Sequence, residues 1–300
     1  MLRCALTIDD APGPDGDASS ALMDAMRRTL ERHGVTHCVA FVIGERVGQE
    51  AELERWLAAG YELANHSHEH AAASDVSAHE VLRSFERCDA VLERLGAFTQ
   101  GRARYARLPF GDRGRDPAER ATIRRGLLDL GYQLADVSIG VSDFIYAPRA
   151  EAALAEARYA DAAEVERRFA AQAHAELLRS EQVTRVQTSD GMVPVPHDFP
   201  HVIALHFMPG TTRFFDRMLS AWSAHVRWVS LAEAIDHDVY ALFEKNPEHN
   251  GVIADALRGD SSLARDVALA LTRRGALVAR RLRIAGNSRK GPRWPYWTGD

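Results

Sequence analysis

Cysteine is scarce in this 300-residue chain and occurs in no metal-binding spacing. The three cysteines, Cys4, Cys38 and Cys88, lie far apart, and no Cys-x-x-Cys pair is present. This pattern argues against a disulfide framework and against a zinc ribbon. Because Cys4 and Cys38 fall within short apolar runs typical of strands, we expect buried, reduced thiols.

Lysine and long apolar runs are also scarce. Lys245 and Lys290 are the only lysines among 37 basic residues, and with abundant alanine this is typical of a GC-rich bacterial genome. The net charge of -5 gives no reason to expect nucleic acid as a partner. No apolar run approaches the roughly 20 residues that span a bilayer. The first ten residues lack the basic and apolar regions of a signal peptide, which predicts a cytoplasmic protein.

Short β-branched runs alternate with longer amphipathic stretches through the first 235 residues. Strands are expected at 2–8, 37–43, 61–65, 104–109, 133–137, 202–206 and 228–231. Helices are expected at 19–33, 50–59, 77–95, 116–130 and 213–225. This alternation predicts a parallel sheet with crossover helices, either an open α/β sheet or a barrel, whose catalytic residues collect at the carboxyl ends of the strands.

Two regions interrupt the alternation. Residues 145–200 contain an Ala/Glu/Arg-rich helical stretch at 150–178 and an irregular segment at 192–200, and we interpret them as a helical insertion in a catalytic barrel spanning 1–235. Residues 236–300 predict a helical extension that ends in a basic, aromatic tail. That tail predicts contact with an anionic lipid headgroup at a membrane surface, a phosphate-bearing substrate or a neighbouring subunit. The alternative is that the helices cover the barrel and the tail is solvated.

A histidine cluster follows one of the expected strands, in the run His66-Ser67-His68-Glu69-His70. Two imidazoles four positions apart can face one point if the backbone coils after the strand, which suits a divalent metal. The alternative is a polar surface loop that happens to be rich in histidine. His68, between the two candidate ligands, is expected to face solvent.

Two adjacent carboxylates close the first expected strand. Asp9 and Asp10 repel each other, and a fold keeps such a pair most easily when each has a cationic partner. One of them can ligate a metal while the other takes a proton from water. The run from Asp9 to Gly16 is also rich in turn formers, so taken alone it favours a turn.

Four motifs together resemble the polysaccharide deacetylase family and follow the family's order. They are Thr7-Ile8-Asp9-Asp10-Ala11-Pro12, His66-Ser67-His68-Glu69-His70, Arg107-Leu108-Pro109-Phe110-Gly111 and Ile203-Ala204-Leu205-His206. The family's Asp-Trp motif is matched less closely by Asp143-Phe144, and the residues between Asp136 and Asp143 resemble a small insertion. The resemblance covers residues 1–235 and implies a distorted (β/α) barrel of about seven strands.

The resemblance implies a role for each residue of the metal centre and for the proton-transfer groups. Asp10, His66 and His70 would hold one divalent metal. Zinc suits two imidazoles and one carboxylate best, with cobalt, nickel or manganese as alternatives. Asp9 would be the general base and His206 the general acid.

Supporting roles are implied for three further residues. Arg107 would pair with Asp9 and fix its orientation, and Asp143 would hold Arg107 in turn. Asp136 is the alternative partner of Arg107. The backbone N–H of Phe110 would help to hold the oxyanion that forms during hydrolysis.

The family resemblance therefore implies a metal-dependent hydrolase. It would remove an acyl group, expected to be acetyl, from the amide nitrogen of an amino sugar or sugar-containing conjugate. One alternative is a deformylase or other amidohydrolase acting on a cytoplasmic lipid-linked or natural-product intermediate. Another is a catalytically silent, sugar-binding barrel. We expect a small N-acyl molecule as partner and no nucleic acid, and the sequence leaves the oligomeric state open.

Overall fold

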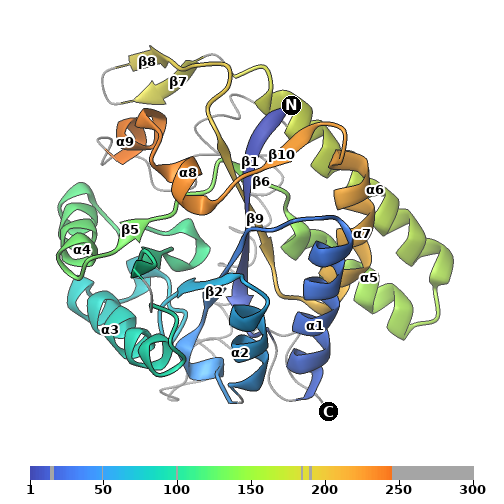
Figure 1. The fold of residues 1–300 in the computed structure, drawn as a ribbon, viewed down its shortest axis with the longest axis horizontal. Coiled ribbons are helices and arrows are strands. Elements are labelled where there is room, and N and C mark those ends of the chain that lie inside the picture. The colour runs from blue at the N-terminus through green and yellow to red at the C-terminus, as the bar shows by residue number, and fades with distance from the viewer. Residues whose placement is uncertain (14–16, 49, 99–100, 184, 189–190, 245–300) are drawn as a thin grey trace, which may run out of the picture.

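Strands and helices alternate along the described part of the chain (Figure 1). The computed structural model describes residues 1–244 except 14–16, 49, 99–100, 184 and 189–190. Its strands are β1 (Leu2–Ala11), β2 (Cys38–Val42), β3 (Glu62–Asn65), β4 (Tyr105–Ala106), β5 (Gln133–Leu134), β6 (Ile139–Gly140), β7 (Arg185–Thr188), β8 (Gly191–Pro194), β9 (His201–His206) and β10 (Val226–Trp228). Its α-helices are α1 (Asp17–Arg32), α2 (Ala51–Ala58), α3 (Ala78–Arg94), α4 (Pro117–Asp129), α5 (Asp143–Ala155), α6 (Tyr159–Ser180), α7 (Pro209–Trp222), α8 (Leu231–Ile235) and α9 (Asp238–Glu244). Short 3-10 helices are η1 (Gly44–Arg46), η2 (Ala73–Asp75) and η4 (Pro109–Gly111).

The main sheet is parallel throughout the described residues. Its strand order is β5-β4-β3-β2-β1-β9-β6, and β10 pairs with the first residues of β1. The sheet curls into a distorted, partly open barrel with helices packed around it (Figure 1). The predicted fold class is confirmed. Parallel pairing also brings the carboxyl ends of the strands, and the residues that follow them, to one edge.

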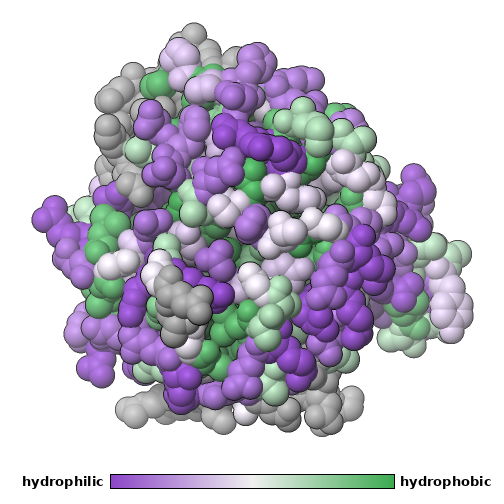
Figure 2. All heavy atoms as spheres, viewed as in Figure 1, coloured by the Kyte–Doolittle hydropathy of each residue, from purple (hydrophilic) through white to green (hydrophobic). Residues whose placement is uncertain are grey.

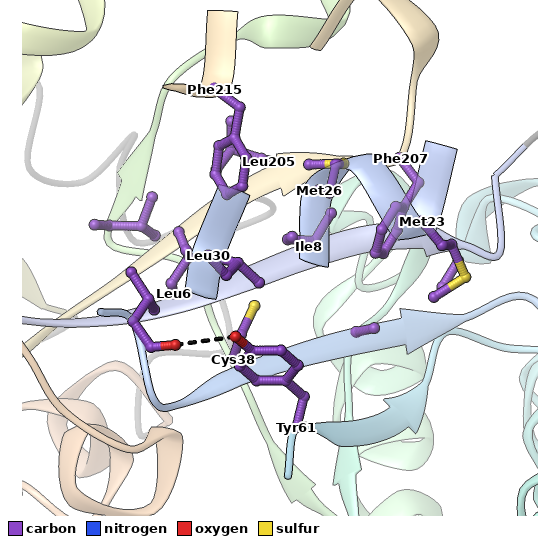
Figure 3. Close-up of a cluster of buried hydrophobic side chains, with 14 of the residues drawn as sticks. Leu6, Ile8, Met23, Met26, Leu30, Cys38, Tyr61, Leu205, Phe207 and Phe215 are labelled. Atoms are coloured by element: carbon purple, nitrogen blue, oxygen red, sulfur yellow. Dashed lines mark hydrogen bonds between the residues drawn. The ribbon is translucent and has the colours of Figure 1, made fainter. Parts of the chain in front are cut away.

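Strand β1 lies at the centre of the core and is buried on both faces. Leu6 and Ile8 belong to one hydrophobic cluster, and Ala5 belongs to a second cluster on the opposite face. In the first cluster, α1 contributes side chains spaced three and four residues apart, Met23, Met26 and Leu30, as a single helix face requires (Figure 3). The residues that β9 and α7 add to this cluster include Leu205 and Phe215. The near-continuous apolar run of β1 therefore reflects a central parallel strand.

The region predicted as a helical insertion differs from the prediction in its elements. The expected single stretch at 150–178 divides into α5 and α6, with Ala157 between them at a φ of 56°. An antiparallel hairpin of β7 and β8 lies before most of the irregular segment, which begins inside β8. Helix α6 packs on the barrel, since Phe169 stacks on Phe214 of α7 with ring centroids 4.7 Å apart. These helices therefore extend the main core.

Two expected elements near the sheet are also corrected. The residues between Asp136 and Asp143, expected to be a small insertion, include β6, which pairs with β9 as a full member of the sheet. The strand expected at 228–231 is β10 and ends earlier. There Ser230 caps α8 by accepting a hydrogen bond from the backbone N of Glu233 at 3.1 Å, so the chain turns into a helix.

The three cysteines are free and buried, as predicted. Burial raises the pKa of Cys88 to about 12, so this thiol stays protonated and unreactive. Hydrophilic residues cover most of the molecular face shown in Figure 2, with apolar residues scattered among them.

The predicted extension at 236–300 falls mostly outside the described residues, which end with α9. The division of the chain at residue 235 stays a prediction. Among the described helices, none combines the length and apolar character that a membrane span requires.

Candidate active site

The carboxyl end of β1 carries Asp9 and Asp10 at an irregularity in the strand. The register of the β1–β2 pairing shifts between Ile8 and Ala11, and Asp10 has a φ of 69°. In a regular strand, neighbouring side chains point to opposite faces of the sheet. A bulge redirects them. The irregularity therefore allows both carboxylates to face the same edge of the barrel.

His66 and His70 lie beside Asp10, where the chain leaves β3. The Nε2 atom of His66 lies 3.6 Å from Oδ1 of Asp10, and that of His70 lies 3.1 Å from it. One ligand atom from each residue lies within 4.8 Å of the others, and this is the one such cluster found among the described residues. The structure thus brings together the three residues predicted as metal ligands.

The hydrogen bonding of this cluster fits a bound cation. Nδ1 of His66 lies 2.8 Å from the backbone O of Arg107, which can only accept, so Nδ1 carries the proton. Burial lowers the pKa of His66 to about 4, so Nε2 presents a lone pair at neutral pH. Oδ1 of Asp10 is buried and has no hydrogen-bond partner in the described residues. A lone pair and a carboxylate oxygen that face each other repel, and a divalent cation bound to both removes the repulsion.

Asp9 is buried and paired with Arg107, as predicted. Nη1 of Arg107 lies 2.5 Å from Oδ1 of Asp9 and donates to Oγ1 of Thr7 at 2.8 Å. Its Nε donates to the backbone O of Ala135 at 2.8 Å, and the guanidinium lies 4.1 Å from the ring centroid of Phe41. A guanidinium held on three sides fixes the orientation of the carboxylate that it contacts.

Asp143 contacts His206 instead of Arg107, so its predicted contact is wrong. The Asp143 carboxylate is fully buried and accepts hydrogen bonds from the backbone N of His206 at 2.7 Å, from Nδ1 of His206 at 2.8 Å and from Oγ1 of Thr211 at 3.0 Å. Burial alone lowers the pKa of His206, but Asp143 and the two aspartates of β1 outweigh burial and raise that pKa to about 10. His206 is therefore protonated at neutral pH.

Asp136, the alternative partner of Arg107, is also placed elsewhere. It pairs with Arg113 at 2.5 Å. The sheet order explains the correction for Asp143. Arg107 follows β4, which three strands separate from β9, whereas Asp143 opens α5 next to the end of β9. The remaining acceptors of Arg107 are the Thr7 hydroxyl and the Ala135 carbonyl.

Phe110 lies on the rim of the ligand cluster. The residue is 50% exposed, and its ring centroid lies 4.6 Å from that of His70. Its φ of 61° turns the chain sharply within η4. The role of its backbone N–H in holding an oxyanion stays a prediction.

Left-handed backbone conformations gather at this edge of the barrel. The non-glycine residues that adopt them here are Asp10 (φ 69°), Ser67 (66°), His70 (52°), Phe110 (61°) and Ser142 (58°). Each costs about 1 kcal/mol or more and persists when its surroundings fix it. Hydrogen bonds fix the backbone of the loop that carries His66 and His70. Oδ1 of Asn65 accepts from the backbone N of Ser67 at 2.9 Å, and Oγ of Ser67 accepts from the backbone N of His70 at 3.1 Å. Strain concentrated in this way is typical of a functional site.

Several residues that support the site were not predicted. Thr7 and Asn65 lie inside or directly before the motifs, so the sequence held a signal for them, whereas Thr211 carried none. His68, expected to face solvent, is half-buried, and its Nδ1 is buried without a hydrogen-bond partner in the described residues. The cause is close packing, since a Cβ added to Gly44 would come within 2.4 Å of that nitrogen.

Comparison with known proteins agrees with this geometry. The family model for polysaccharide deacetylase matches residues 3–135. Over that range, the chain is similar to polysaccharide deacetylases. Members of this family are hydrolases. A search of curated proteins finds no match.

Solved structures of family 4 carbohydrate esterases share the fold at low sequence identity. BA3943 from Bacillus anthracis, described as a pseudoenzyme, is 16% identical with a TM-score of 0.53, over 78% of this chain and 66% of its own. The peptidoglycan deacetylase PdaC from Bacillus subtilis is 17% identical with a TM-score of 0.51, over 80% and 93%. An acetyl xylan esterase from Clostridium thermocellum, in complex with a cobalt ion, is 19% identical with a TM-score of 0.50, over 83% and 98%. This chain spans about two thirds of the length of BA3943. At these identities the similarity shows the fold alone.

Proposed function

We propose that this chain is a metal-dependent N-deacetylase. It removes an acyl group, acetyl in the first instance, from the amide nitrogen of an amino sugar or sugar-containing conjugate. The observation that carries the proposal is the ligand cluster of Asp10, His66 and His70, which lies at the same sheet edge as a buried carboxylate, Asp9, and a protonated imidazole, His206. The match to the deacetylase family model supports hydrolysis, and the ligand cluster supports a metal.

The cluster would hold one divalent ion. Two imidazoles and one carboxylate suit zinc, with cobalt, nickel or manganese as alternatives. When bound, such an ion polarises the acyl carbonyl and lowers the pKa of water. The protein's own residues then position the substrate and move the protons.

Asp9 and His206 divide the proton transfers between them. Asp9 accepts a proton from the water that attacks the acyl carbon, and its pairing with Arg107 keeps it oriented. Since Asp143 accepts from Nδ1 of His206, the other ring nitrogen is left to donate its proton to the amide nitrogen as the C–N bond breaks. The products are a carboxylic acid and a free amine. The backbone N–H of Phe110 would donate to the carbonyl oxygen while it carries negative charge.

Two aromatic rings beside the reacting groups support a sugar as the substrate. The ring of Phe110 lies against His70, and the ring of Phe144 lies 5.4 Å from that of His206 between centroids. Pockets for organic ligands commonly combine such apolar faces with a few polar groups. The apolar face of a pyranose ring matches this combination.

Metal analysis followed by a substrate screen tests the proposal. The purified protein, reconstituted separately with zinc, cobalt, nickel and manganese, is assayed with N-acetyl and N-formyl amino sugars and with acetylated polymers. We expect release of acetate from a small amino sugar with at least one metal, and almost none from Asp9→Asn. Release of formate alone would favour the deformylase. Sugar binding without turnover under every metal would favour the silent barrel.

A further inference from the structure

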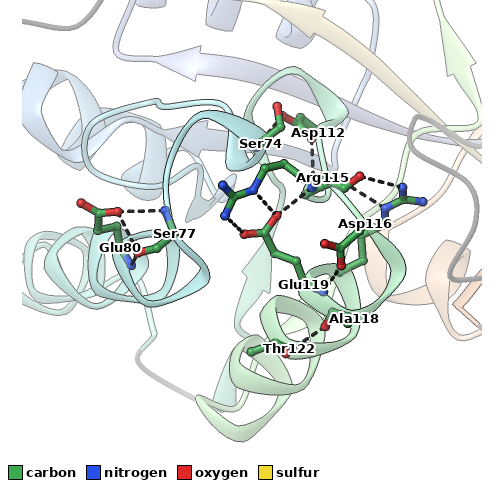
Figure 4. A network of polar contacts seen from close by, with 11 residues as sticks. Ser74, Ser77, Glu80, Asp112, Arg115, Asp116, Ala118, Glu119 and Thr122 are labelled. Atoms are coloured by element: carbon green, nitrogen blue, oxygen red, sulfur yellow. Dashed lines mark hydrogen bonds and ion pairs between the residues drawn. The ribbon is translucent and has the colours of Figure 1, made fainter.

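Asp112 joins two loops that flank the metal ligands (Figure 4). Its Oδ2 accepts hydrogen bonds from the backbone N of Ser74 at 2.8 Å and from the Ser74 hydroxyl. Its Oδ1 accepts from the backbone N of Gly114 at 3.0 Å. Asp112 directly follows η4, and Ser74 lies in η2, four residues after His70. One carboxylate thus connects the loop that carries a ligand to the loop that carries the third motif.

Both connected loops contact the metal ligands. His70 and Phe110 have left-handed backbones, and their rings are in contact, with centroids 4.6 Å apart. The backbone O of Arg107, three residues before Phe110, accepts from Nδ1 of His66. A shift between the two loops would therefore disturb the surroundings of both imidazole ligands.

We propose that Asp112 is a positioning residue for the metal site, which holds the His70 loop against the turn of Phe110. The inference rests on the proposed function, because it takes His70 as a ligand. A carboxylate suits this position because three donors converge on its two oxygens. An amide has only one oxygen, so its NH₂ group would face one of these donors without forming a hydrogen bond. Replacement of a group that orients metal ligands typically weakens metal binding or lowers activity by about 10–100-fold.

Glu80 provides a matched control in the same region (Figure 4). Its Oε2 accepts from the backbone N of Ser77 at 2.8 Å and from the Ser77 hydroxyl at 2.7 Å, in the capping box of α3. The donors are the same two groups of a serine, but this pair ties a helix end and no ligand loop. Glu80→Gln therefore reports the general effect of exchanging a serine-bonded carboxylate for an amide.

The test compares full-length wild type, Asp112→Asn, Ser74→Ala and Glu80→Gln after titration with Co²⁺. Asp112→Asn should bind Co²⁺ about 10–100-fold more weakly and alter its visible absorption spectrum, which reports ligand geometry. Ser74→Ala removes one of the three hydrogen bonds. It should change the Co²⁺ affinity and the absorption spectrum in the same direction, but to a smaller extent. Glu80→Gln should match wild type. In turnover assays, Asp112→Asn should lower kcat with little change in KM.

Hydrogen exchange of the metal-free proteins provides a readout that is independent of metal and of activity. Amides at 71–75 and 110–114 should exchange faster in Asp112→Asn and at the wild-type rate in Glu80→Gln. An Asp112→Asn protein with wild-type cobalt affinity and spectrum would overturn the inference. If that variant does not fold, a wild-type spectrum in Ser74→Ala would overturn it. Wild type that binds no cobalt, zinc, nickel or manganese would instead overturn the proposed function and the inference with it.

Discussion

At the scale of single residues, hydrogen-bond partners decide which proton each ionisable group can move. Asp9 accepts a hydrogen bond from Arg107, which orients its carboxylate for the role of a base. His206 donates from Nδ1 to Asp143 and remains an imidazolium, which is the form that an acid requires. A carboxylate placed to accept a proton and an imidazolium placed to donate one, at the same edge, are the arrangement that amide hydrolysis needs.

Replacement of Asp9 by Asn should retain metal and fold but reduce hydrolysis by about 10²–10⁴-fold. The amide fills the same space and can still accept from Arg107, yet it cannot take up the proton. Turnover of an N-acetyl amino sugar is measured at matched metal content. Near-normal turnover would show that another group is the base.

His206 should make the stability of the metal-free protein depend on pH. Its pKa is about 10 in the folded state, against about 6.5 in an unfolded chain. Its contribution to stability is therefore complete below about pH 6.5 and is lost as the pH rises through about 10. The difference in the free energy of unfolding between wild type and His206→Asn, from urea denaturation, should be larger near pH 6 than near pH 11. Equal differences at both values would contradict the raised pKa.

The sequence was sufficient for the ligand cluster and for the Asp9–Arg107 pair, because their motifs match the family's order and lie at the carboxyl ends of parallel strands. It was insufficient for the partner of Asp143. Which strand end lies next to which depends on the order of strands in the sheet, and the order along the chain does not give it. Asp112 was missed for a related reason, since its partner Ser74 belongs to another loop.

At the scale of elements, long periodic segments were predictable and short ones were not. The expected helices and the strands of the sheet's centre agree with the structure to within a few residues. β6 has only two residues, too few for any period to appear. The break between α5 and α6 occurs at Ala157 without a glycine or proline, whereas Pro148 lies inside α5. Packing of these helices against α7 and the core, as between Phe169 and Phe214, outweighs the local signals.

The contact between α5 and α7 can be tested at Gly210. A Cβ added there would come within 2.7 Å of Cα, Cβ and O of Ala147, and this backbone cannot give way easily. Gly210→Ala should therefore lower the free energy of unfolding by about 1–3 kcal/mol in urea denaturation. Gly48→Ala is the control, because an added Cβ there meets nothing within 4 Å. Equal stability of the two variants would show that the helices do not pack this closely.

At the scale of the whole molecule, the two ends of the barrel differ. The ligand cluster lies at the carboxyl ends of the strands, whereas the β7–β8 hairpin lies near the end where β1 begins (Figure 1). A buried polar group at that second end, formed by Ser138, His201 and Tyr240, joins α9 to the sheet. This group therefore has a structural role, at an end of the barrel where the described residues form no metal-ligand cluster.

Removal of the chain after Asn287 tests whether the basic tail is separate from the chemistry. The tail lies outside the described residues, and its sequence holds no metal-ligand cluster that complements the barrel. The shortened protein should keep its metal content and its turnover of a small N-acyl substrate. Its oligomeric state, or its affinity for a larger charged substrate, should change if the tail binds a partner. Loss of small-substrate turnover by a folded, shortened chain would make the tail part of the active site.

Metal stoichiometry tests the three-ligand site most directly. Wild type loaded with zinc and freed of excess metal should contain about one ion per chain. His66→Ala and His70→Ala should each lose stoichiometric zinc. His68→Ala, a control in the same loop, should retain it, because His68 contributes no ligand atom to the cluster. Full retention of zinc by both the His66→Ala and His70→Ala proteins would contradict the site.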